Sequence, residues 1–317
     1  MSLKSYSHYH IGGLAQYFIE VRTVDVLEQA MLRWRKAMPS QTDYLNHCFI
    51  LGGGTNVLFD DRGFSGLIVK PVFQAISHDD FLIRAEAGIS VATLLDYTIQ
   101  HSLSGLEWAG GLPGELGGAL RGNAGAFGGE MKDVVVSVTS LDATSGRPRL
   151  ITRTNAECQF GYRSSIFKTN DLDHRKKEII LSATLLLSQG ERRAIRDAIE
   201  DKISYRRERH PIEYPNAGSI FKNVPVEQLP PAIIASVKHV IKNDPFPVLP
   251  VAYIIAESGL KGVSFGGAMI SPKHPNFIVN VLNATAEDVK TLINLIHYTV
   301  KGKFGIDLEE EIMCIPY

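Results

Sequence analysis

Apolar side chains recur at helical spacing in several stretches of the chain. The first is residues 24–37, where Val26, Leu27, Ala30, Met31 and Trp34 form one stripe on a charged segment. Further helices are predicted after a Ser90 cap over residues 91–99, over residues 191–209, over residues 251–258, and in a last long segment. That last helix begins with a capping box, Thr285 and Asp288, and its apolar face is Val289, Leu292, Ile293 and Ile296.

Short apolar runs bounded by glycine, proline or polar residues predict strands. These runs cover residues 48–51, 66–69, 81–87, 134–141, 178–187, 264–270 and 277–282. The mixture is typical of an α+β protein. We expect a first portion over residues 1–205, divided near residue 70, and a smaller αβ portion over residues 206–317.

Residues 105–129 show no period and hold ten of the 28 glycines. Each glycine adds conformational entropy that folding must remove, so this density disfavours a regular element. We therefore expect a glycine-rich loop that is kept for a purpose other than stability.

Composition narrows the function classes. With 33 basic and 34 acidic side chains, the net charge is −1, which argues against a general nucleic-acid-binding protein. The three cysteines, Cys48, Cys158 and Cys314, have neither disulfide-framework nor zinc spacing, and we expect no metal site. No apolar segment is long enough for a signal peptide or a membrane span, so we expect a cytoplasmic protein without membrane or nucleic-acid partners.

Two glycine-rich motifs carry the chemical signal. Glycine loops expose backbone N–H groups that suit phosphate oxygens, and neither the Walker nor the G-x-G-x-x-G pattern is present. Two such motifs in one portion predict a large nucleotide cofactor. The candidate residues are Gly52, Gly53, Gly54, Thr55 and Asn56 in the first motif, and Gly110, Gly111, Pro113, Gly114, Gly117, Gly118, Asn123, Ala124 and Gly125 in the second.

Together these motifs resemble the FAD-binding signature of the UDP-N-acetylenolpyruvoylglucosamine reductase (MurB) family. The similarity continues in order through residues 161–164 (GYRS), 216–223 (NAGSIFKN), 259–262 (GLKG) with 266–268 (GGA), and 308–312 (LEEEI). It implies an FAD-binding domain of the vanillyl-alcohol-oxidase type, with two αβ subdomains, followed by a C-terminal αβ substrate domain.

The resemblance also implies a reaction. NADPH would give hydride to non-covalently bound FAD, which would give it to the enolpyruvyl double bond of UDP-N-acetylglucosamine enolpyruvate. The product would be UDP-N-acetylmuramate, a peptidoglycan precursor. Side chains cannot perform hydride chemistry, so such a reaction requires the flavin.

Three catalytic residues follow from matching motif positions. Arg163 would hold the substrate carboxylate as charge develops on it, although an arginine can also be a structural ion-pair partner. Ser219 would supply a proton to carbon; a helix cap or turn is the alternative role. Glu311 is the last acid of the motif, where the family usually has proline at the position of Glu310. The register therefore leaves Glu309 as the alternative to Glu311.

The substrate's diphosphate calls for local positive charge in the C-terminal portion. Asn223 and Lys261 match family positions that contact substrate, whereas Lys222 follows from adjacency and charge. Tyr162 and His274 lie in matching regions. An exposed side chain without a role is the alternative for each lysine.

Two other functions stay open. An oxidase of the same fold would often attach its flavin through a histidine near the first glycine motif, but His47 and His78 lie outside that motif. A non-catalytic nucleotide-binding relative is disfavoured because Arg163, Ser219 and Glu311 are all present. No tyrosine-bearing loop is evident between Ser165 and Glu178, which favours the shorter-loop subtype of the family.

Overall fold

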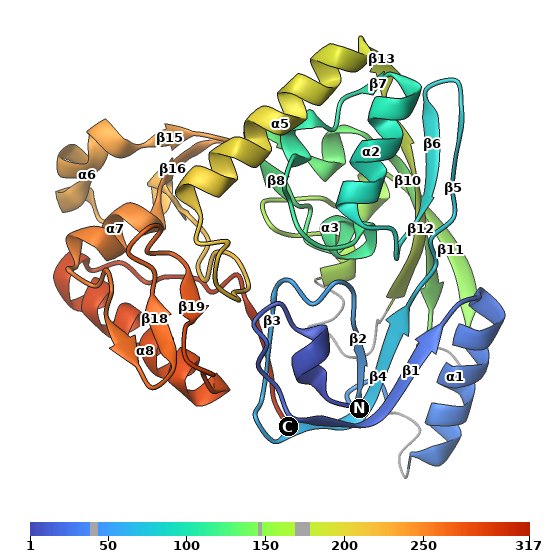
Figure 1. Cartoon of the computed structure of the whole chain (residues 1–317), viewed down its shortest axis with the longest axis horizontal. Helices are drawn as coiled ribbons and strands as arrows, with labels where there is room; N and C mark the ends of the chain where they lie inside the picture. The colour runs from blue at the N-terminus through green and yellow to red at the C-terminus, as the bar shows by residue number, and fades with distance from the viewer. Residues whose placement is uncertain (39–43, 145–147, 169–177) are drawn as a thin grey trace. The chain divides into compact units, whose positions relative to one another are not determined.

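The computed structural model describes residues 1–38, 44–144, 148–168 and 178–317 (Figure 1). The chain forms two compact units. Unit 1 comprises residue 1 with residues 15–53 and 65–204, and unit 2 comprises residues 2–14, 54–64 and 205–317. The predicted domain bounds at residues 70 and 205 stay predictions.

Unit 1 contains a small sheet flanked by one helix. Strands β1 (Leu14–Val21), β4 (Gly63–Pro71) and β2 (Cys48–Ile50) lie in the order β1-β4-β2, with β2 parallel to β4. Helix α1 (Val24–Ala37) starts at Thr23, whose side chain accepts a hydrogen bond from the Val26 N–H. Leu27 and Met31 are buried as the stripe predicts, but Val26 is exposed.

The second sheet of unit 1 is antiparallel and shares a core with several helices. Its strands are β11 (Arg149–Thr154), β10 (Val135–Asp142), β12 (Glu178–Leu186), β6 (Leu82–Glu86) and β5 (Ile76–Asp79), in that order. Side chains from β6, β10 and β12 share a core with α2 (Val91–His101), α3 (Leu116–Arg121) and α5 (Arg192–Arg209). Two-residue pairs complete the unit: β7 (Leu103–Ser104) with β13 (Ser188–Gln189), and β8 (Gly125–Ala126) with β9 (Gly129–Glu130).

The glycine-rich segment differs from its prediction. Residues 105–129 contain α3 as well as loops, so the expectation of a segment without regular elements is wrong. Leu116, Ala119 and Leu120 are buried, and this packing stabilises a helix that its glycines disfavour.

Unit 2 is built from short strands and three helices. Strand β3 (Val57–Phe59) pairs with β20 (Met313–Ile315). A three-stranded sheet has the order β14 (Val224–Pro225), β16 (Pro247–Leu249), β15 (Lys242–Asn243). Another has the order β17 (Ser264–Phe265), β18 (Ala268–Ile270), β19 (Ile278–Asn280). The helices are α6 (Pro231–Val237), α7 (Val251–Glu257) and α8 (Ala286–Phe304). The single strand predicted over residues 264–270 is instead the hairpin β17-β18, which turns at Gly266 and Gly267.

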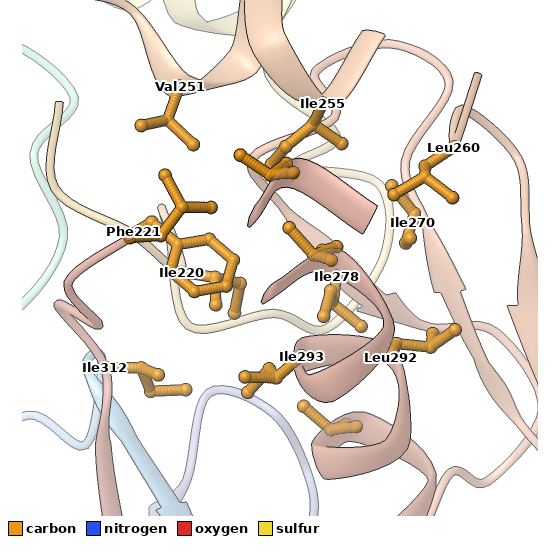
Figure 2. Close-up of a cluster of buried hydrophobic side chains, with 14 of the residues drawn as sticks. Ile220, Phe221, Val251, Ile255, Leu260, Ile270, Ile278, Leu292, Ile293 and Ile312 are labelled. Atoms are coloured by element: carbon orange, nitrogen blue, oxygen red, sulfur yellow. The ribbon is translucent and has the colours of Figure 1, made fainter. Parts of the chain in front are cut away.

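The core of unit 2 gathers the ends of the chain. Ile220 and Phe221 lie with Ile312, with Ile255 of α7 and with Ile293 of α8 (Figure 2). The predicted capping box of α8 is confirmed, since Thr285 and Asp288 exchange side-chain and backbone hydrogen bonds. Among the described residues, no helix combines the length and apolarity needed to cross a bilayer.

Candidate active site

The first glycine loop leaves its backbone donors unused. Strand β2 ends at Ile50, and among the residues that the structure describes no acceptor faces the backbone N–H groups of residues 52–56. Gly52 and Gly53 belong to unit 1, and Gly54, Thr55 and Asn56 to unit 2. Consecutive free N–H groups in a glycine loop are suited to anionic oxygens.

In unit 1 the two glycine motifs touch. A Cβ built on Gly53 would lie 2.9 Å from the Cα of Gly114, so backbone packs directly on backbone. Gly114, at φ 108°, is held in turn by its carbonyl, which accepts from the Val91 N–H at the start of α2. The glycines at 53 and 114 are therefore required by packing and backbone conformation.

Other positions of the second motif are occupied by glycine for different reasons. A Cβ on Gly117 would lie 3.0 Å from Ala87 Cβ, and one on Gly125 would lie 2.6 Å from Glu130 Cγ. Gly118 is exposed, and a Cβ there would meet nothing within 4 Å among the described residues. Packing does not require glycine at 118, and the missing side chain leaves this backbone open to a ligand.

The predicted catalytic arginine lies beside the second glycine motif. Gly161 and Ser164 exchange two backbone hydrogen bonds, which places Tyr162 and Arg163 at the tip of a tight turn. Arg163 has φ 53°, a conformation that is uncommon for a non-glycine residue and clusters at functional sites. Its Nη2 donates to the Gly125 carbonyl at 2.8 Å.

Asn123 fixes that turn to the motif. Its Nδ2 donates to the Gly161 carbonyl at 3.0 Å, and its Oδ1 accepts from the Lys132 N–H at 2.9 Å. Asn123 is fully buried. Both ends of its amide are engaged by protein groups, so Asn123 links the turn at Gly161 to the backbone at Lys132.

In unit 2, Ser219 follows a turn and is not a helix cap. Gly218 has φ 78°, and its N–H donates to Oδ1 of Asn216 at 2.9 Å. Ser219 lies outside any helix, and its hydroxyl makes no hydrogen bond with any described residue. Of the two structural alternatives for Ser219, the helix cap is therefore absent from this segment, whereas the turn before it is present.

The acidic motif runs antiparallel to the segment that follows Ser219. Phe221 pairs with Glu310, the Glu311 N–H donates to the Ile220 carbonyl at 2.7 Å, and the Lys222 N–H donates to the Glu309 carbonyl at 2.9 Å. This register places Glu311 opposite Ile220, the residue next to Ser219.

The three acids have distinct surroundings. The Glu309 carboxylate forms an ion pair with Lys222, and Glu310 Oε1 lies 3.2 Å from His297 Nε2 on α8. Both Glu309 and Glu310 are exposed, whereas Glu311 is half-buried. Glu311 also accepts, through its backbone carbonyl, a hydrogen bond from Asn56 Nδ2. Glu311 is thus less exposed than Glu309, and the choice between them as the functional acid stays a prediction.

The predicted substrate residues of unit 2 are less uniform. Asn223 uses its Oδ1 to accept from the Val251 N–H, at the first residue of α7. Lys261 is exposed and has no partner among the described residues. His274 packs edge-to-face on His210 at 5.2 Å, and burial lowers the pKa of both rings to about 4. Nδ1 of His274 is buried with no hydrogen-bond partner in the described part of the chain.

The structure thus gathers the predicted residues in two sets. Unit 1 brings Arg163 and Tyr162 to the second glycine motif, and unit 2 brings Ser219, Lys222 and Glu311 to one pair of adjoining segments. Sequence reasoning missed Lys70 and Glu115, which connect the two glycine motifs; the only signal was a charge placed inside a glycine-rich stretch. The tyrosine-loop comparison concerns residues 166–177, most of which lie outside the described residues.

Two family models match the chain. Residues 42–149 match a family model described as an FAD binding domain. Residues 210–315 match the model of the UDP-N-acetylenolpyruvoylglucosamine reductase C-terminal domain.

Relatives match over nearly the full length. The UDP-N-acetylenolpyruvoylglucosamine reductase of Chlamydia pneumoniae is 37% identical, over 99% of this chain and 90% of that protein. The enzyme of the same name from Clostridium tetani is 32% identical with the same coverage. The chain belongs to the UDP-N-acetylenolpyruvoylglucosamine reductase family. The crystal structure of the Thermus caldophilus member, at 27% identity, covers 100% of this chain and 98% of that one with a TM-score of 0.75.

Membership of the reductase family confirms the resemblance inferred from the motifs, and with it the fold class: an FAD-binding domain followed by the family's C-terminal domain. It also makes the chain a flavin oxidoreductase of cell-wall precursor synthesis. The roles of individual site residues stay predictions, as does the subtype.

Proposed function

We propose that the chain reduces UDP-N-acetylglucosamine enolpyruvate to UDP-N-acetylmuramate in the cytoplasm, with non-covalent FAD as cofactor and NADPH as hydride donor. Full-length similarity to reductases of that name supports the reaction class. The observation that carries the assignment to this chain's residues is the antiparallel register that sets Glu311 beside the Ser219 segment.

The chemistry of the glycine motifs fits FAD. Free N–H groups in residues 52–56 suit a diphosphate, and the bare backbone at Gly118 leaves room for a ligand. Gly52, Gly53, Gly111, Gly114 and Gly118 would hold the cofactor in unit 1. When bound, FAD supplies the hydride chemistry that side chains lack.

Arg163 would stabilise charge on the substrate. Hydride arrival at the terminal alkene carbon leaves negative charge on the neighbouring carbon and its carboxylate. A guanidinium can bind a carboxylate through two parallel N–H donors, and the hydrogen bond to Gly125 orients Arg163 before substrate arrives. The neighbouring Tyr162 ring, 5.2 Å from Cζ of Arg163, limits the positions that this side chain can adopt.

Ser219 would deliver the proton that completes the reduction. Serine is a weak acid, so it can serve only a strongly basic carbon, and an enolate-like intermediate is one. The Ser219 hydroxyl is not engaged by any described residue and is thus available. Glu311, whose backbone is held opposite Ile220, would orient the Ser219 hydroxyl.

Binding of the UDP part falls to the remaining residues of unit 2. Lys222, Asn223, Lys261 and His274 would supply charge and hydrogen bonds to the diphosphate and the nucleoside. Lys222 is already paired with Glu309, which would moderate its contribution.

The test is an anaerobic absorbance titration of the purified flavoprotein. NADPH should bleach the flavin bands, and UDP-N-acetylglucosamine enolpyruvate should restore them. Bleaching without recovery would retain an FAD oxidoreductase but reject this substrate. A protein that binds no FAD after reconstitution would reject the cofactor and favour a non-catalytic relative.

A further inference from the structure

Lys70 contacts both glycine loops of unit 1. It lies on β4, and its Nζ donates to the Gly52 carbonyl at 3.1 Å and to Oε1 of Glu115 at 3.0 Å. Gly52 belongs to the first motif, and Glu115 directly follows Gly114 of the second. One ammonium group therefore joins the two loops at the place where Gly53 and Gly114 pack backbone on backbone.

The ion pair is largely removed from water. The Lys70 and Glu115 side chains are 14% and 16% exposed. Burial raises the pKa of Glu115, and the adjacent Lys70 opposes that rise. Among the described residues, Lys70 is the charged group that acts on Glu115, so without it this carboxylate would lack a compensating charge.

The position of Glu115 is unusual for an anion site. A carboxylate beside a loop such as residues 52–56, which presents free N–H groups, would repel the phosphates that this loop suits. Glu115 does not cap α3 with its side chain, so helix capping does not account for it. The described hydrogen-bond partner of its carboxylate is Lys70. The pair therefore links the two loops without leaving a net negative charge.

We infer that Lys70 and Glu115 are a positioning pair for the cofactor, in which Lys70 sets the spacing of the two glycine loops and neutralises Glu115 beside the FAD diphosphate. This inference rests on the proposed function, because it takes the glycine loops to be the cofactor site. Neither residue needs to touch the reacting atoms.

A double-mutant cycle on FAD affinity tests the inference. Lys70→Met should weaken FAD binding about tenfold or more, because it leaves a buried carboxylate uncompensated near the phosphates. Glu115→Gln should change the affinity by less than about threefold, and adding it to Lys70→Met should restore most of the loss. Arg153→Met is the matched control, since it removes the cation of another part-buried ion pair of unit 1, that with Glu178.

The pH dependence of FAD affinity provides a second readout. In Lys70→Met the Glu115 carboxylate should take up a proton more readily, so FAD affinity should recover as pH is lowered, and it should not do so in the double variant. A purely structural pair would lower the melting temperature of the apoprotein while leaving the FAD affinity and its pH profile unchanged, which would overturn the inference. The inference would also be overturned if the effects of the two single substitutions on FAD affinity simply added in the double variant. Failure of the unsubstituted protein to bind FAD would instead overturn the proposed function together with this inference.

Discussion

The side-chain amide of Asn56 donates a hydrogen bond of 2.9 Å to the backbone carbonyl of Glu311. The Asn56 carbonyl in turn accepts from the Met313 N–H at 3.1 Å. Asn56 belongs to the glycine loop predicted to bind the cofactor, and within unit 2 it also holds the segment that carries the predicted acid. The cofactor motif and the acidic motif are thus directly connected.

Asn56→Ala should therefore slow the substrate half-reaction more than the NADPH half-reaction. Loss of the hydrogen bond removes one restraint on the Glu311 backbone, whose N–H still donates to Ile220. Small displacements at a reacting centre cost roughly tenfold to a hundredfold in rate. Stopped-flow absorbance, with the two half-reactions followed separately, measures the split. Equal losses, or loss of FAD itself, would show that Asn56 acts through the cofactor alone.

Arg163→Ala should reduce flavin oxidation by substrate by about a hundredfold to a thousandfold, the range seen when one donor to a developing anion is removed. Flavin bleaching by NADPH should be much less affected, because the proposed contact is with the enolpyruvyl carboxylate. Arg163→Lys should recover little, since an ammonium lacks the two-donor fork. Arg149→Ala, which removes an exposed arginine of the same unit, is the control. Wild-type rates in Arg163→Ala would reassign this residue.

Ser219→Ala should abolish most turnover while substrate still binds, because proton delivery to carbon is lost; general acids contribute about a hundredfold to ten-thousandfold. Ser219→Cys replaces the hydroxyl with a stronger acid of similar size and should retain more activity. Measuring kcat and KM for both variants distinguishes a proton donor from a binding residue. If KM rises and kcat stays constant, Ser219 is a binding residue and not the proton donor.

Glu311→Gln and Glu309→Gln together resolve the register of the acidic motif. The first should lower kcat strongly, whereas the second should leave kcat near that of the unsubstituted enzyme and act mainly on KM, since it releases Lys222 from its ion pair. Steady-state kinetics of the pair measures this. The reverse ranking would transfer the catalytic role to Glu309.

Periodicity predicted those elements whose apolar stripes are buried on one face. Helices α1, α2 and α8 fall where the spacing of buried residues places them, and Thr285 starts α8 as its motif predicts. Helix α3 was missed because its glycines erase the pattern, and tertiary packing of Leu116 and Leu120 overrides their propensity.

The site was predictable as a set of motifs but not as a set of contacts. Motif order singled out Arg163, Ser219 and Glu311, yet nothing local indicates that Arg163 bonds Gly125 or that Asn56 bonds Glu311. The Asn56 contact accompanies the pairing of strand β3 with β20 from the far end of the chain, and the Arg163 contact joins two loops 38 residues apart. Pairing between segments so distant in sequence leaves no periodic signal.

The buried histidine pair should make unit 2 acid-sensitive. Burial lowers the pKa of His274 and His210 from 6.5 to about 4, and His274, Arg206 and Lys273 add to the effect on His210. Between these pH values the unfolded chain binds more protons than the folded one, so the free energy of unfolding falls as pH drops from about 6.5 towards 4. Above about pH 6.5 both states leave the rings neutral, and this contribution becomes constant.

His274→Gln should flatten that pH dependence, because one of the two rings no longer takes up a proton on unfolding. Each such proton contributes at most about 1.4 kcal/mol per pH unit to the slope. Denaturant unfolding at about pH 7 and pH 5 measures it, and His239→Gln, an exposed histidine of the same unit, is the matched control. His274→Gln should be less stable than the unsubstituted protein at the higher pH and approach it at the lower one. An unchanged slope in His274→Gln would mean that the ring is already protonated in the folded protein.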